Sequence, residues 1–242
     1  MGGCFSGFGL ASKSKGGKIE IGYWAIRGLG APLRMMCTYG GVEFTDYQVS
    51  DPKDWFGSKK EEIKAKCPIA NLPYLIDGDV VVTQSNACFL YLGDRFGLNG
   101  KTPAEKLKVL MMVEEIYDLR NKVIDLVYPF KGLCRNFPEH MEKLNGHLQK
   151  DVLGNYAKVE GMIEGPFTLG SSISTPDFHI FEMLDQHEMM YEKANIASTL
   201  GTFPKLKKLY ETVKALPELK PYFASPAYKF PVNNQGAGAH FF

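Results

Sequence analysis

Two short apolar runs on either side of Asp77-Gly78 constrain the fold most, because this pattern is typical of a β-hairpin. The stretch NLPYLIDGDVVVTQSNA contains both runs, and Asp-Gly suits a tight turn that needs a positive φ. Pro73 stands directly before the first run. A trans proline there would remove a ladder hydrogen bond, whereas a cis bond would make a sharp entry turn. The segment SNACFLYLGDRFGL that follows the hairpin is predicted to be a helix.

The residues before the hairpin also mix strand and helix patterns. KIEIGYW alternates apolar and polar residues as a strand does, and VEFTDYQV reads as a second strand. Between them, RGLGAP leads into an apolar helix that ends at Gly40-Gly41. DPKDWFGSKKEEIKAKCPIA is polar and irregular or partly helical. Together with the hairpin, this order predicts an α/β domain over residues 18–97, preceded by a flexible arm over 1–17.

The second half of the chain shows helix patterns and no convincing strand. Thr102 and Glu105 predict a capped helix start with Pro103 at the first helical position. Ser174 and Asp177 predict a second such start, flanked by Ile173 and Phe178 as a hydrophobic staple, and FPKLKKLYETVKAL reads as an amphipathic surface helix. We therefore predict an all-helical domain over 103–223 and a tail over 224–242.

The first of these helices carries many apolar residues. They are Leu107, Leu110, Met111, Val113, Ile116 and Tyr117, and they cover more than one face. This distribution predicts a helix that is buried on several sides.

Composition excludes several kinds of protein. The net charge is +1, which argues against a dedicated nucleic-acid binder, and no apolar run reaches the roughly 18 residues that span a bilayer. Five scattered cysteines without a C-x-x-C pair suit free thiols in a reducing compartment, so we expect a cytoplasmic protein. The five histidines lack close spacing with cysteines or carboxylates, so no metal site is predicted.

The arm over 1–17 carries a lipidation pattern. Met-Gly-x-x-x-Ser matches an N-myristoylation signal with Gly2 as the acceptor, and Cys4 could take a palmitoyl chain. Stable anchoring needs such a second signal, so we expect lipid-anchored membrane association of an acylated form. The alternative is a disordered extension with a chance match.

The two ends of the hairpin suggest a binding site. A sharp turn at Pro73 would leave the backbone of Leu72 free to pair with an extended peptide. Gln84 and Ser85 stand where a strand gives way to a helix, and N–H groups and a hydroxyl at such a junction can bind a carboxylate. The pattern therefore favours a small acidic peptide as ligand. The alternative is an ordinary hairpin followed by a capped helix.

Three sequence blocks in order, GYWAIRGLG, NLPYLIDG and TQSNA, resemble the cytosolic glutathione S-transferases, most closely the mu class. IKAKCPIANLP is more similar to the pi class, and the insertion characteristic of the mu class is absent. The resemblance runs from about Lys18 to about Pro231. It implies a thioredoxin-like N-terminal domain, an all-α C-terminal domain and a homodimer.

The resemblance also implies the activity. Such an enzyme conjugates the thiolate of reduced glutathione, a co-substrate and not a bound cofactor, to hydrophobic electrophiles in detoxification. Two alternatives stay open: a glutathione-dependent isomerase of the sigma type, similar to prostaglandin D synthase, and a non-catalytic carrier of hydrophobic ligands.

Individual residues carry over from the family. Tyr23 matches the catalytic tyrosine, whose phenol donates a hydrogen bond to the glutathione sulfur. The implied glutathione-binding residues are Trp24, Leu29, Trp55, Lys64, Asn71, Leu72, Pro73, Gln84 and Ser85, with Asp118 reaching in from the second subunit. Lys59 and Lys60 are rivals of Lys64. Tyr128 and Phe230 are implied to lie near the electrophile. Ile69 stands where these classes often insert an aromatic side chain into the second subunit.

Overall fold

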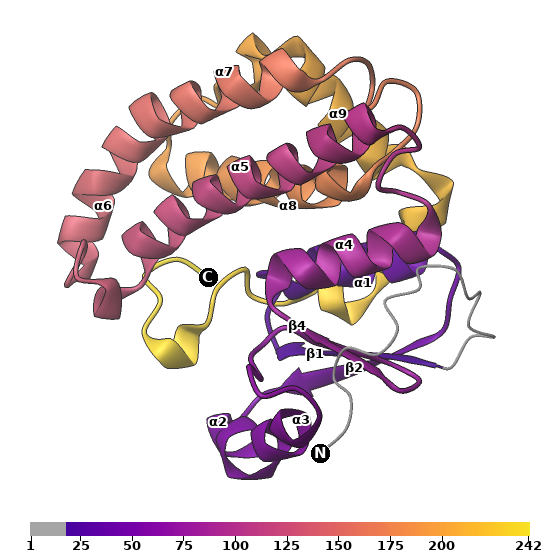
Figure 1. Cartoon of the computed structure of the whole chain (residues 1–242). Coiled ribbons are helices and arrows are strands. Elements are labelled where there is room, and N and C mark those ends of the chain that lie inside the picture. Colours follow the sequence, from indigo (N-terminus) through magenta and orange to yellow (C-terminus); the bar gives the residue numbers. More distant parts are fainter. Residues whose placement is uncertain (1–17) are drawn as a thin grey trace.

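The computed structural model describes residues 18–242 and shows a sheet-containing domain followed by a helical domain (Figure 1). Helices α1 (Gly30–Tyr39) and α4 (Ser85–Phe96) lie between the sheet and the later helices, and both pack against α8 (Thr175–Ala194). The predicted α/β domain plus all-α domain is therefore confirmed. The arm with Gly2 and Cys4 lies outside the described residues.

The first domain is built on a four-stranded mixed sheet in the order β2-β1-β3-β4. Its strands are β1 (Ile19–Trp24), β2 (Phe44–Val49), β3 (Tyr74–Asp77) and β4 (Val80–Thr83). β1 is parallel to β2 and antiparallel to β3, and β4 returns antiparallel to β3. Because β1 is central, Ile19, Ile21 and Tyr23 are all buried.

The hairpin forms as predicted, although its turn lies one residue later than Asp-Gly suggests. Asp77 still pairs with Val80 in the ladder, so the two loop residues are Gly78 and Asp79. Gly78 alone has a positive φ, 60°, which matches a type II′ turn with glycine first. The Leu72–Pro73 bond is cis, so of the two alternatives for Pro73 the structure shows the sharp entry turn.

The polar segment after β2 is helical. It comprises α2 (Pro52–Asp54), a π-helical turn (Trp55–Lys59) and α3 (Lys60–Lys66). Val49, Trp55, Ile63 and Tyr74 form a small separate core in which the indole of Trp55 stacks on the Tyr74 ring, with 6.0 Å between ring centroids. The prediction of a partly helical segment is confirmed.

The second domain is helical throughout apart from one isolated bridge between Phe167 and Gly170. Its longer elements are α5 (Pro103–Val127), α6 (Phe137–Gly146), a π-helical turn (His147–Asp151), α7 (Val152–Met162), α8, α9 (Pro204–Ala215) and α10 (Lys220–Ala224). Both predicted capping boxes are present at α5 and α8. None of the helices within residues 18–242 is long and apolar enough to cross a membrane.

The prediction that α5 is buried on several sides is wrong. Leu107, Leu110 and Met111 are 58%, 42% and 48% exposed, while Met112 and Val113 are buried. The helix packs against α4, α6, α7 and α8, but the stripe of 107, 110 and 111 stays exposed. An apolar sequence pattern indicates which helix residues favour burial. It does not show whether they pack against other helices of the same chain or against a second molecule.

The C-terminal tail returns to the junction of the two domains. In Figure 1 this yellow segment runs from the helical domain past α1 and ends near α5. Arg27 N–H donates to Pro231 O at 2.8 Å and His240 N–H donates to Val127 O at 3.0 Å. The tail is thus bonded to the loop after β1 in one domain and to the end of α5 in the other.

Candidate functional site

Tyr23 lies near the end of the central strand β1, where the RGLG turn begins. Its side chain is buried, and no other group within residues 18–242 forms a hydrogen bond with its hydroxyl. Gly28 has a φ of 38°, and a Cβ at this position would lie 2.9 Å from the Tyr23 oxygen. Glycine therefore serves here both for its backbone conformation and for the close approach of the phenol.

The Tyr23 side chain lines a small cavity of about 10 Å³ at the domain junction. The polar residues that line it are Tyr23, Arg120, Tyr128, His179, Gln186 and Asn233. Tyr128, expected near the electrophile, is thus brought next to Tyr23, and its hydroxyl accepts a hydrogen bond from Asn234 N–H at 2.7 Å. Phe230, expected there too, does not line the cavity, because its ring lies over the Arg34 guanidinium at 5.6 Å.

Four of these polar residues were not anticipated: Arg120, His179, Gln186 and Asn233. Part of the set has a sequence signal, since His179, Glu182 and Gln186 recur at i, i+3 and i+7 in α8, a helix that is buried over most of its length. Polar residues at that spacing share one face of the helix. Asn233 carries no such signal, because only the path of the tail brings it here.

The cavity contains an imidazole that is neutral at physiological pH. Burial, together with the positive Arg120, lowers the pKa of His179 to about 3. The His179 side chain therefore contributes hydrogen-bonding groups without charge, and Arg120 supplies the positive charge among the residues that line the cavity.

A second, open cleft of about 460 Å³ lies beside the hairpin. Of the predicted glutathione-binding residues it brings together Lys64, Asn71 and Gln84. The rival Lys60 also lines it. Lys59 does not, because its ammonium pairs with Glu20 and Glu62, each at 3.2 Å. Glu61 lines the cleft as well, and its carboxylate pairs with the Lys64 ammonium at 3.5 Å. The cleft thus offers two cations, one carboxylate and the side-chain amides of Asn71 and Gln84.

The hairpin meets the cleft with unusual backbone geometry. Gln84 has a φ of 73°, which is uncommon for a residue other than glycine and typical of functional sites. Ser85 is the first residue of α4, and no side chain caps that helix start, so its N–H groups are available to a ligand. The Leu72 N–H donates to the side chain of Asn71 at 2.9 Å, a bond that a peptide pairing with Leu72 would replace.

The other predicted residues line neither hollow. Trp55 lies in the small core on Tyr74, and Leu29 lies in the main core. Trp24 is half-buried, with its ring 6.4 Å from that of Phe56. Asp118 is exposed on α5.

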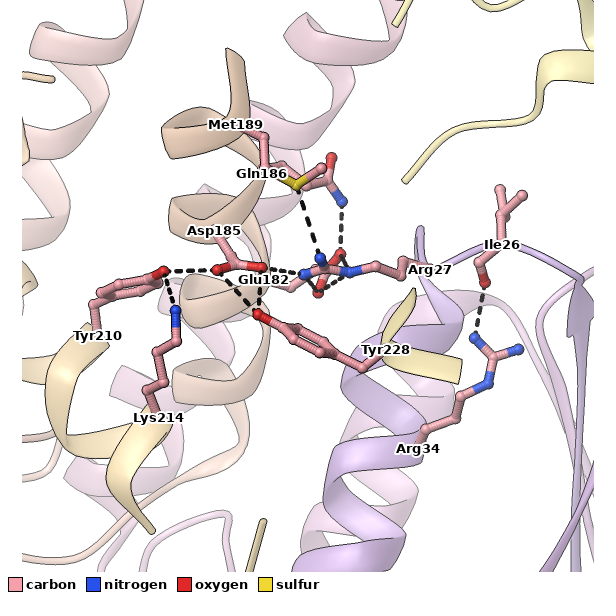
Figure 2. Close-up of polar contacts among 10 residues, drawn as sticks. All are labelled: Ile26, Arg27, Arg34, Glu182, Asp185, Gln186, Met189, Tyr210, Lys214 and Tyr228. Carbon is pink, nitrogen blue, oxygen red and sulfur yellow. Dashed lines mark hydrogen bonds and ion pairs between the residues drawn. The ribbon is translucent and has the colours of Figure 1, made fainter. Parts of the chain in front are cut away.

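A buried ion-pair network fixes the loop that follows Tyr23 (Figure 2). The guanidinium of Arg27 donates to Glu182 at 2.7 Å and to Asp185 at 2.6 Å, both on α8. The hydroxyls of Tyr210 and Tyr228 donate to Asp185 at 2.7 and 3.2 Å. Because Arg27 belongs to the first domain and its partners to the second, the network sets how the domains meet around Tyr23.

Within residues 18–242, no group of three or more histidine, cysteine, aspartate or glutamate residues is placed to hold a metal ion.

Comparisons with known proteins agree with this geometry. The family profile "Glutathione S-transferase, N-terminal domain" matches residues 19–94, and "Glutathione S-transferase, C-terminal domain" matches 117–226. A glutathione S-transferase of Dermatophagoides pteronyssinus is 32% identical over 84% of this chain and 88% of its own length. A class-mu 26 kDa isozyme of Fasciola hepatica is 33% identical over 88% and 90%.

A solved structure extends the likeness to three dimensions. The pi-class glutathione S-transferase of Onchocerca volvulus has a TM-score of 0.75 and 29% identity, covering 91% of this chain and 99% of its own. The mixture of mu-class and pi-class features expected from the sequence is thus confirmed. The two profiles, the relatives and the shared fold show that the chain belongs to the glutathione S-transferase family.

Proposed function

We propose that the chain is a glutathione transferase that conjugates reduced glutathione, as co-substrate, to hydrophobic electrophiles in detoxification. The observation that carries this is the Tyr23 hydroxyl, which is held beside Gly28, lines the junction cavity and has no hydrogen-bond partner among the described residues. A donor without a partner is available to a ligand atom, and a thiolate sulfur is the acceptor that this family presents.

The chemistry requires the thiol of glutathione to ionise near neutral pH. An unperturbed thiol has a pKa of about 8.5, so little thiolate exists at pH 7. One well-placed donor stabilises the anion, and a depression of roughly 2 units corresponds to about 2.7 kcal/mol. Tyr23 is proposed as that donor, and the enzyme supplies proximity as well.

The open cleft is proposed to hold the rest of the tripeptide. Its volume of about 460 Å³ lies within the usual range of about 300–1,000 Å³ for small-molecule sites. Lys60 and Lys64 supply positive charge for the glycyl carboxylate. The start of α4 at Ser85, which follows Gln84, supplies N–H groups for the γ-glutamyl end. Leu72 is proposed to pair with the cysteinyl unit through its backbone.

Replacing Tyr23 by Phe tests the proposal. We expect kcat/KM for conjugation to fall about 100-fold, because about 2.7 kcal/mol of thiolate stabilisation is lost, while the Kd for glutathione stays within about twofold. A thiolate absorbance difference spectrum should lose its band at neutral pH. Tyr47→Phe, which removes a hydroxyl from β2 outside both hollows, is the matched control. Wild-type activity in Tyr23→Phe would reject the assignment.

A homodimer is proposed on the exposed stripe of α5. Leu107, Met111 and Asp118 recur at i, i+4 and i+11 on this helix, and Ile69, 63% exposed, projects from the loop before cis-Pro73. Burial of Ile69 against a second copy would contribute roughly 1.5–3 kcal/mol. Asp118, on the same stripe, would then face the second copy's glutathione.

Sedimentation of the wild type should show dimers at micromolar concentration, and Leu107→Glu should shift them to monomers. A monomeric wild type would reject the proposed homodimer.

Acylation of the N-terminal arm is proposed from its sequence alone. Gly2 is the acceptor for myristate and Cys4 for palmitate, and the doubly acylated form would leave the cytoplasmic pool for membranes. Metabolic labelling with a myristate analogue should mark the wild type and not Gly2→Ala. An unlabelled wild type contradicts the proposal.

A further inference from the structure

Two histidines pack together where the end of the C-terminal tail meets the helical domain. His140, on α6, is 1% exposed, and His240, in the tail, is half-buried. Their ring centroids lie 5.4 Å apart, with 40° between the ring planes. The histidine pair, His140 and His240, therefore joins the tail to α6 by a direct contact between two titratable rings.

Hydrogen bonds to backbone carbonyls define the protonation of both rings. Nδ1 of His140 lies 3.1 Å from Leu126 O, and Nε2 of His240 lies 3.3 Å from Cys134 O. Because a carbonyl oxygen only accepts, each of these nitrogens carries a proton. The other nitrogen of each neutral ring carries none. A proton added there keeps both hydrogen bonds and changes only the charge of the pair.

The surroundings of the histidine pair do not balance such a charge. Within residues 18–242, neither imidazole forms an ion pair. Glu139 accepts a hydrogen bond from Arg135 N–H at 2.8 Å, and Asp125 pairs with Lys131 at 3.4 Å, so both nearby carboxylates are bonded to other groups. The charged and titratable side chains on the surrounding elements are Asp125 on α5, Lys131, Cys134 and Arg135 in the connection to α6, Glu139 and Lys143 on α6, His147 in the π-helical turn and His187 on α8.

The contact therefore weakens in acid. Burial lowers the pKa of His140, the bond to Leu126 O opposes this change, and His240 lowers the pKa further. When the tail leaves, His140 loses both its cover and its neighbouring imidazole, so its pKa returns toward the ordinary value of about 6.5. Below about pH 6.5 the detached state binds more protons than the closed state, and falling pH favours detachment.

We propose that the histidine pair is a pH-sensitive clasp that releases the end of the tail, residues 234–242, from the helical domain when the pair takes up a proton. In the closed state the His240 N–H donates to Val127 O at 3.0 Å, and Ala239 and Phe241 are buried. Release also frees the Tyr128 hydroxyl, which accepts from Asn234 N–H in the closed state.

The start of the tail stays in place during this release. Arg27 N–H donates to Pro231 O at 2.8 Å and Gly28 N–H donates to Val232 O at 3.2 Å, and neither bond involves a titratable side chain of the pair. The tail is therefore expected to open from its far end, with residues 231 and 232 as the fixed end.

Hydrogen exchange of the full chain, measured by mass spectrometry between pH 7.5 and 5.5, tests the proposal. A peptide over 234–242 reports release of the tail, and a peptide over β1 reports unfolding of the whole chain. After correction for the intrinsic exchange rate, opening of the tail should rise about 3- to 10-fold between pH 6.5 and 5.5, because one proton shifts an equilibrium at most about tenfold per pH unit. The readout is exchange and not turnover, so it does not depend on the proposed function.

Two variants remove one titratable ring each and keep a donor. His140→Asn retains an amide N–H near the position of Nδ1, and His240→Gln retains one near the position of Nε2. Each should reduce the rise in tail opening to less than about twofold, because the pair no longer takes up the proton. His179→Gln, which removes a buried histidine outside the pair, is the matched control and should keep the rise.

Three results would overturn the clasp. The first is tail exchange in the wild type that does not change with pH. The second is a rise that persists in both His140→Asn and His240→Gln. The third is a tail that exchanges no faster than β1, which would mean that it opens only when the whole chain unfolds. His240→Gln changes a half-buried position, so it keeps the test decisive if His140→Asn does not fold.

Discussion

At the scale of single residues, the site depends on contacts that allow no added atom. The Tyr23 phenol lies against Gly28, and its position decides where the hydroxyl points. This contact is steric and involves no hydrogen bond, so a list of hydrogen bonds does not include it. The effect of this contact can be separated from the effect of the positive φ at Gly28. Gly78 also has a positive φ, but a Cβ added there would meet nothing within 4 Å.

We therefore predict different outcomes for two Gly→Ala variants. Gly28→Ala and Gly78→Ala should each lower the free energy of unfolding by about 1–2 kcal/mol, because both place a Cβ at positive φ. Only Gly28→Ala should also reduce conjugation, because its Cβ would meet the Tyr23 oxygen at 2.9 Å while that of Gly78 meets nothing within 4 Å. Urea denaturation and kcat/KM measure the two effects. Equal activity of the two variants would show that the contact does not position Tyr23.

At the scale of elements, the start of α8 is held by one buried carboxylate. The buried carboxylate of Asp177 accepts from the N–H and hydroxyl of Thr168 and from the N–H and hydroxyl of Ser174. Burial raises the pKa of Asp177, while these four donors oppose that change. Because α8 also carries His179 and the partners of Arg27, its start helps to fix the cavity wall.

The two capping boxes of the chain offer a direct comparison. Asp177→Ala should lower the free energy of unfolding by about 2–4 kcal/mol, because it leaves buried donors unpaired. Thr102→Ala, at the exposed box of α5, should cost only about 1 kcal/mol, because water replaces the lost bond. Urea denaturation of both variants gives the values. Equal costs would mean that burial does not strengthen the α8 box.

At the scale of the whole molecule, the domains are joined by polar groups as well as by the core. Arg27 bonds to α8, and the tail bonds to both domains, so the cavity exists only when both domains are folded and docked. Neutral histidines are buried inside this unit. Burial lowers the pKa values of His147, His179 and His187, so each is uncharged in the folded protein at neutral pH.

This burial predicts acid sensitivity. The pKa of His179 is about 3 in the folded protein and about 6.5 when unfolded, so between these values the unfolded state binds one more proton. Stability should therefore fall with pH below about 6.5, by about 1.4 kcal/mol per pH unit for this residue. His179→Gln should make the slope shallower by that amount, measured by urea denaturation at pH 4.5 to 7. Parallel slopes would contradict the prediction.

Local chemistry made much of the molecule predictable from its sequence. The strands, the helix starts at Thr102 and Ser174, and the positive φ of Gly78 each depend on a few neighbouring residues, so their signals survive in a short stretch. The sequence blocks around Tyr23, Leu72 and Gln84 identified the family, and the family implied the fold of most of the chain.

The tertiary structure alone decided which residues meet across long separations in the chain. It set the stripe of Leu107 and Met111 outside the core, put Phe230 on Arg34, and brought Asn233 to the cavity of Tyr23. Periodicity identifies the residues that avoid water. It does not identify the surface that covers them, because that depends on how the elements dock and on the path of the returning tail.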